Sequence, residues 1–305
     1  MLRIAALLMV AHALTSVAPA QLPPASQPRT AATAPSAQEF APGVKIDWLA
    51  PAVRVAGHVV LREGSLEFLA CFAGKEHESI IRLDAGGKDI YLALGLIGVS
   101  PGAPPRWDEQ RQAFDPPRGD LVDISLEWLE DGRRRAAAAN NWLRSAEYAT
   151  PVIERPWVFS GSRRVESDAL ICDQSGEGVA LVDFPNSLLS LSRGYTSHDT
   201  DLWAIANSAA IPPEDTQVTV VLHPARTREI DARLDRRGAL LIDGTPAGVD
   251  DLVDLLRMMS RIDPARVQPI RVESPLRADE QALRSALTRA GIAETLLRIE
   301  RTNPH

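Results

Sequence analysis

The N-terminal 44 residues constrain this chain most, because their composition gives little to a folded core. Ile4 to Ala18 form an apolar run after Arg3, and Ala18-Pro19-Ala20 offers the small residues at which a signal peptidase cleaves. A helix that spans a bilayer needs about 20 apolar residues. We therefore expect residues 1–20 to be a cleaved signal peptide, which fits better than a retained anchor.

The segment that follows is rich in Pro, Ala and Ser and predicts a linker over residues 21–44. What remains is too long for one small core and suggests two domains, over residues 45–225 and 226–305. No later apolar run is long enough to cross a membrane, so the mature chain is expected without a transmembrane segment. The expected location is periplasmic or secreted.

Charge and cysteine content exclude several classes of protein. The formal net charge is −7 and the basic residues are scattered, which argues against a nucleic-acid partner. Cys71 and Cys172 are the only cysteines. They are either a disulfide in an oxidising compartment or two buried thiols, and they are too few for a four-cysteine iron–sulfur cluster.

Short apolar segments between turn residues predict a sheet-rich α+β fold for residues 45–225. We expect extended segments at 53–61, 65–73, 77–83, 157–162 and 215–224, hairpins that turn at 131–132 and 175–176, and helices at 88–99 and 202–209.

The stretch "CFAGKEHESI", residues 71–80, concentrates reactive side chains and supplies the candidate binding residues Lys75, His77, Glu78 and Ser79. The metalloprotease pattern H-E-x-x-H is absent, because Ile81 stands where the second histidine is needed. If a strand begins at His77, the side chains of His77 and Ser79 share one face and Glu78 points to the other. These residues then form no contiguous relay, and we assign no catalytic residue.

A metal site is the alternative use of this region. His58, Cys71, His77 and Glu78 are suitable ligands, but their spacing matches no standard zinc pattern. A structural network, in which Lys75, His77 and Glu78 satisfy backbone groups at a turn, explains this region better. Asp199 and Asp201 near His198 are a further cation candidate, but helix capping explains them more simply. We therefore predict no metal and no cofactor.

Four segments together resemble the YdjY domain of exported bacterial proteins, often from planctomycetes. They are "FAGKEHESI", "YLALGLIGVSPGAPP", "WVFSGS" and "VTVVLHP", within residues 53–224. The core Gly74-Lys75-x-His77-Glu78-Ser79 is the most specific match. The resemblance implies location and architecture, but no biochemical activity.

Residues 226–305 predict a small two-layer ββαβαβ domain. Two extended segments join at Asp235 to Gly238, and a helical stripe follows over 249–262. A strand at 268–274, a helix at 278–291 closed by Gly291, and a last strand at 293–301 complete the order.

This order resembles the periplasmic domain of ExbD and TolR proteins, over residues 227–303. The resemblance rests on "DRRGALLIDGTPAGVDDLVDLL" and "LRSALTRAGIAETLLRI". Those proteins carry a transmembrane helix with a proton-coupling aspartate just before the domain. Here residues 218–222 are only a strand-length apolar run before Pro224, so the resemblance implies an adaptor domain and no proton-driven work.

Three functional hypotheses follow, of which the last is a purely structural periplasmic or surface component. The first is an exported, non-enzymatic envelope protein that binds an envelope protein or a cell-wall component, and that can form a homodimer through its C-terminal domain. The second is a hydrolytic or metal-dependent enzyme centred on Lys75, His77 and Glu78.

Overall fold

Strand β3 (Ala52–Val59) is where the main sheet closes on itself. Along one edge it pairs with β17 (Gln217–Pro224) and along the other with β2 (Val44–Asp47) and then β5 (Ser79–Leu83). From β17 the path continues through the strands β10, β13, β15, β14 and β4 back to β5. The computed structural model describes residues 37–147, 149–165, 169–195, 201–274, 276–293, 295 and 297–301.

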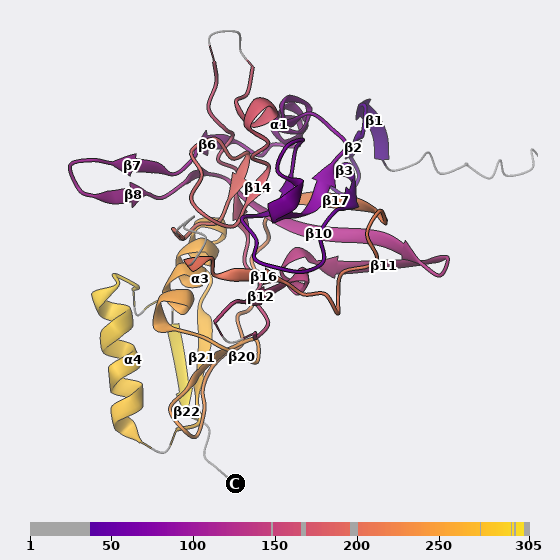
Figure 1. Cartoon of the computed structure of the whole chain (residues 1–305). Coiled ribbons are helices and arrows are strands. Elements are labelled where there is room, and N and C mark those ends of the chain that lie inside the picture. Colours follow the sequence, from indigo (N-terminus) through magenta and orange to yellow (C-terminus); the bar gives the residue numbers. More distant parts are fainter. Residues whose placement is uncertain are drawn as a thin grey trace, which may run out of the picture. The chain divides into compact units, whose positions relative to one another are not determined.

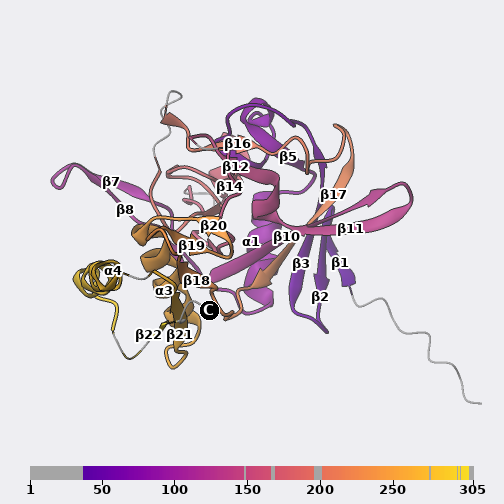
Figure 2. The same ribbon diagram turned by 90° about the horizontal axis from the view of Figure 1, so that it is seen from below.

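The remaining strands of this closed path are unequal in length. The long β10 (Leu121–Glu130) alternates buried and half-buried residues, as expected for a strand with one face on the core. The others are short and mostly buried: β4 (Phe68–Cys71), β13 (Trp157–Val158), β14 (Val179–Ala180) and β15 (Leu189–Ser190). Figure 2 shows β1, β2, β3 and β17 side by side, in their pairing order.

The linker predicted for residues 21–44 is not wholly outside the sheet. Strand β1 (Ala37–Ala41) pairs with β2, and Val44 is completely buried. Pairing and burial of these few residues outweigh the polar composition around them. The predicted signal peptide and linker residues 21–36 lie outside the described residues.

Several predicted elements of residues 45–225 have the expected type. Helix α1 (Gly87–Leu96) confirms most of the helix predicted at 88–99 but ends three residues earlier. The hairpin of β10 and β11 (Arg133–Ala138) turns at Asp131 and Gly132, both with positive φ. Smaller elements are β6 (Pro101–Ala103), β7 (Arg106–Asp108), β8 (Ala113–Asp115), β9 (Arg118–Gly119), η2 (Ala139–Trp142) and β12 (Leu143–Ser145).

Three local predictions are wrong. Glu76–Glu78 form the 3-10 turn η1, so β5 begins at Ser79 and not at His77. The hairpin expected at 175–176 is the short helix α2 (Cys172–Ser175), ended by left-handed Gly176. The helix expected at 202–209 is replaced by strand β16 (Ala204–Ala206), because pairing with β12 outweighs helix propensity there.

The C-terminal residues form a second sheet in the order β20-β19-β18-β21-β22. Its strands are β18 (Ala232–Leu234), β19 (Leu240–Ile242), β20 (Thr245–Pro246), β21 (Gln268–Val272) and β22 (Leu297–Arg301). Helices α3 (Val249–Ile262) and α4 (Arg277–Arg289) alternate with the last strands. Figure 1 shows α4 beside β21 and β22.

Two hydrophobic cores support these sheets, and backbone contacts place both in one compact unit. The first is enclosed by the closed sheet and contains Trp142, Trp157 and Phe159. The second packs α3 and α4 on the C-terminal sheet, and it also takes in Leu121, Ile153 and Val158 from the first part of the chain. The cores are therefore in contact through β10 and β13. The chain has the sheet-rich, mixed α+β character predicted from its sequence.

Among the described residues, the helices are too short or too polar to cross a bilayer. The longest, α3, has 14 residues, whereas a spanning helix needs about 20.

Removing a core side chain from β10 tests this arrangement. Leu126 is fully buried on this strand, so Leu126→Ala should lower the free energy of unfolding by about 2–5 kcal/mol, measured by urea denaturation. Leu129 lies three residues on and is 66% exposed, so Leu129→Ala is the matched control and should change it by less than about 0.5 kcal/mol. Equal effects of the two variants would contradict the assigned face of β10.

Candidate functional site

The turn between β4 and β5 holds the candidate binding residues predicted from the sequence. Gly74 has φ +101° and opens the turn, and its backbone N–H donates to Glu76 Oε2 at 2.8 Å. Ser79 Oγ donates to the carbonyl oxygen of Lys75 at 2.7 Å. The backbone groups of the turn are thus bonded by Glu76 and Ser79, and not by Lys75, His77 and Glu78 as the network interpretation expected.

Lys75 and Glu78 form an ion pair. Lys75 Nζ lies 2.6 Å from Glu78 Oε1, and 28% and 17% of the two side chains are exposed. The ammonium also lies 5.7 Å from the ring centroid of Phe68 and 5.6 Å from that of Phe184, and these two rings stack on each other. Such distances allow cation–π attraction from both rings.

Two further glutamates contribute to the charge balance at Lys75. Burial alone would lower the pKa of Lys75, but the hydrogen bond and charge of Glu78, followed by the charges of Glu67 and Glu177, outweigh it and raise that pKa. Glu67 and Glu177 are both buried, and Glu177 accepts hydrogen bonds from the backbone and side-chain nitrogens of Asn186. We call Lys75, Glu78, Glu67, Glu177, Phe68 and Phe184 the Lys75 cluster.

His77 lies at the solvent side of this cluster. Its side chain is 74% exposed, and its Nε2 is 3.7 Å from Glu78 Oε2. The expectation that His77 and Glu78 point to opposite faces is therefore wrong, because a 3-10 turn does not alternate its side chains as a strand does. Glu78 nevertheless makes its shorter contact with Lys75.

The candidate metal ligands are not gathered in one place. Among the residues that the structure describes, no three His, Cys, Asp or Glu side chains are arranged to hold a metal ion. His58 Nδ1 instead lies 3.2 Å from Asp84 Oδ1. Of the second candidate cluster, Asp201 is described and exposed, whereas His198 and Asp199 lie outside the described residues.

Cys71 and Cys172 are free, buried thiols, so the alternative of a disulfide between them is not formed in this structure. Burial raises the pKa of Cys71 to about 11 and that of Cys172 to about 12. Hydrogen bonds lower these pKa values in part, from Ser79 at Cys71 and from Ser162 at Cys172. Both thiols therefore stay protonated at neutral pH and behave as small core residues.

A second candidate site lies where the two parts of the chain meet, and sequence reasoning missed it. It is a groove of about 1030 Å³ whose wall comes from three separate segments, within residues 145–155, 193–203 and 246–251. Tyr195 and Trp203 stack in it with ring centroids 4.6 Å apart and planes 22° apart. Because the groove joins three segments that are distant in the sequence, no local sequence pattern indicates it.

Hydrogen bonds fix the orientation of the aromatic pair. Trp203 Nε1 donates to the carbonyl oxygen of Leu181 at 2.8 Å, and the backbone N–H of Asp183 donates to the carbonyl oxygen of Tyr195. The guanidinium of Arg193 lies 5.5 Å from the centroid of the Tyr195 ring. Burial raises the pKa of the Asp183 carboxyl to about 6, although a hydrogen bond from the backbone of Tyr195 to this carboxylate partly lowers that pKa.

Arg155 forms the charged base of the groove. Its side chain is only 4% exposed, and it donates to Asp251 Oδ1 at 3.2 Å and to Asp254 Oδ2 at 3.3 Å. Asp251 also accepts from Arg193 at 3.1 Å and from the backbone N–H of Gly248, the N-cap of α3. Asp251 therefore both caps α3 and holds two arginines of the first part of the chain.

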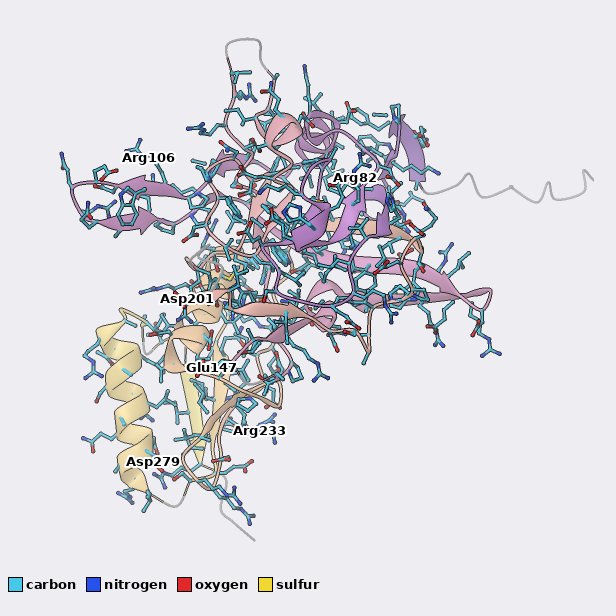
Figure 3. All side chains as sticks on the ribbon, viewed as in Figure 1. Arg82, Arg106, Glu147, Asp201, Arg233 and Asp279 are labelled. Carbon is cyan, nitrogen blue, oxygen red and sulfur yellow. The ribbon has the colours of Figure 1, made fainter. Side chains whose placement is uncertain are left out.

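The rim of the groove is acidic. Glu147 and Asp201 are exposed, and Figure 3 shows both near α3. Among the described lining residues, Arg155 and the half-buried Arg193 are both paired with aspartates of α3. A ligand that combines an apolar surface with a positive charge fits these walls best.

The Lys75 cluster makes a prediction about stability. Lys75→Met removes the cation that is paired with Glu78 and that faces the charges of Glu67 and Glu177, so the free energy of unfolding should fall by about 1–3 kcal/mol in urea denaturation. His77→Ala, in the same turn but mostly exposed, is the control and should cost less than about 0.5 kcal/mol. If His77→Ala proved as costly as Lys75→Met, the roles assigned to these two residues would be wrong.

Comparison with known families places most of these features in one domain. The sequence model of the YdjY domain matches residues 44–223. The match includes the turn with Lys75 and Glu78 and runs from β2 almost to the end of β17. No curated protein and no solved structure matches this chain. The family match covers more than half of the 305 residues and confirms the resemblance expected from the sequence. The chain belongs to the YdjY domain family.

Proposed function

We propose that this chain is an exported envelope protein that acts by binding, and that it holds its ligand in the groove between its YdjY domain and its C-terminal part. The single observation that supports a binding role is the groove of about 1030 Å³ with the stacked Tyr195 and Trp203 in its wall. An aromatic surface with a few polar groups converging on it is typical of binding sites.

In this proposal the C-terminal part is an adaptor domain of the kind found in the periplasmic part of ExbD and TolR. Its α3 supplies Gly248 and Asp251 to the groove, so a ligand there touches both parts of the chain. Ligand binding is thereby coupled to the position of the adaptor. The export expected from residues 1–20 puts this assembly in the periplasm or outside the cell.

A second candidate is catalysis at Lys75, His77 and Glu78, and the 3.7 Å distance between His77 Nε2 and Glu78 Oε2 is the observation that favours it. A histidine beside a carboxylate is a common acid–base arrangement. Against it, the carboxylate of Glu78 is paired with Lys75 and most of the imidazole faces solvent. We therefore rank binding first.

Site-specific crosslinking in the native cell tests the binding proposal. A photoreactive amino acid at Ala247, in the groove wall, should give one defined adduct, because a ligand there is held in contact with it. The same amino acid at Leu129, exposed on β10, is the matched control and should not give that adduct. The groove adduct should be lost in a Trp203→Ala background.

An adduct pattern that is the same from both positions, or that survives Trp203→Ala, would contradict the proposal. Because Trp203 packs on Tyr195, the folding of Trp203→Ala is checked by its urea unfolding curve. Glu147→Arg, an exposed rim change, serves as a second variant that leaves the packing intact.

A further inference from the structure

The groove has the chemistry of a site for proline-rich chain. Recognition of polyproline segments uses grooves lined by aromatic side chains, on which an extended, preformed helix docks. Here Tyr195 and Trp203 supply the aromatic wall, and Pro151 and Pro246 line the groove as well. The acidic rim at Glu147 and Asp201 would attract a basic residue next to the prolines.

This chain carries a segment with that chemistry outside the described residues. Residues 22–29 read "LPPASQPR" and contain three prolines and a final arginine. A polyproline helix has about three residues per turn, so Leu22, Ala25 and Pro28 would share one apolar face when the segment is bound. Arg29 follows directly and matches the acidic rim in charge.

The reach of the chain favours docking between two molecules. The eight residue-to-residue steps from Arg29 to Ala37, where β1 begins, would span about 25 Å in polyproline form. Five strand spacings of about 4.8 Å, or about 24 Å, separate β1 from β13 along the sheet, and the groove residue Arg155 precedes β13. Docking within one molecule would need a fully stretched connection, whereas a second copy has no such restriction.

We propose that the groove binds a proline-rich segment that bears an arginine, and that its occupant is residues 22–29 of a second copy of this chain. The inference rests on the proposed binding function and names the partner of that groove. It makes the self-association of this protein depend on the N-terminal segment, and not on pairing of strand edges in the C-terminal part.

Sedimentation velocity of the chain from Gln21 to His305, over a range of concentrations, tests the inference. We expect concentration-dependent association, weakened about tenfold or more by Pro24→Gly with Pro28→Gly, since glycine lacks the preference of proline for the polyproline conformation and loses more entropy on binding. Pro35→Gly, in the same proline-rich region but outside the segment, is the matched control and should leave the association unchanged. A synthetic peptide of residues 22–29 should compete.

A charge exchange makes the test specific for the groove. Arg29→Glu alone, and Glu147→Arg with Asp201→Arg alone, should each weaken association about tenfold, since each places like charges together. Combining the two sets in one chain should restore it. The exposed rim residues tolerate such changes, so loss of folding is not expected.

The outcomes separate this inference from the proposed function. A chain that stays monomeric, or association that ignores the segment variants, overturns the second copy as occupant. If the peptide binds the groove of a monomeric chain, the second copy is likewise overturned. A Trp203-dependent adduct to a different envelope protein, without self-association, would leave the binding function standing while this inference fails.

Discussion

The buried guanidinium of Arg155 is the interaction on which the arrangement of the two sheets depends. A charge that is 96% buried is stable only when its partners offset the loss of hydration, and here the partners are two aspartates of α3. Asp254 also accepts from Ser192 at 2.7 Å, so its own position is fixed from the first part of the chain. The YdjY domain and the C-terminal helix are thereby joined by charges that neither part satisfies alone.

Apolar packing reinforces this join and explains why the groove forms beside it. Leu121, Ile153 and Val158 belong to the same core as α3. Arg228 donates to the carbonyl oxygen of Glu154, and this bond adds a polar contact on the same side. The short segment from Ile153 to Val158 therefore contributes both apolar and polar contacts, and residues just before it line the groove. A ligand bound at such a boundary contacts both parts of the chain.

Much of the fold could be predicted from local patterns, whereas the site could not. Alternation in β3 and β10 and the apolar stripe of α3 reflect burial of one face, which the sequence records directly. The pattern of residues 77–83 predicts a strand that begins at His77, but Gly74 and the Glu76 carboxylate stabilise a turn there instead. Residues 204–206 look helical, yet their strand exists only because β12 lies beside them. The groove joins three distant segments, and no local pattern links Arg155 to Asp251 or Tyr195 to Trp203.

A double-mutant cycle on Arg155 and Asp254 tests the central claim most directly. With Arg155→Met, Asp254→Asn and their combination, urea denaturation should give a coupling energy of at least about 1 kcal/mol, since the pair is buried and shares its carboxylate with Ser192. The exposed pair Arg135 and Glu130, at 2.8 Å, is the matched reference and should couple by less than about 0.5 kcal/mol. If the effects at Arg155 and Asp254 are additive, so that their coupling energy is no larger than that of the exposed pair, the account is contradicted.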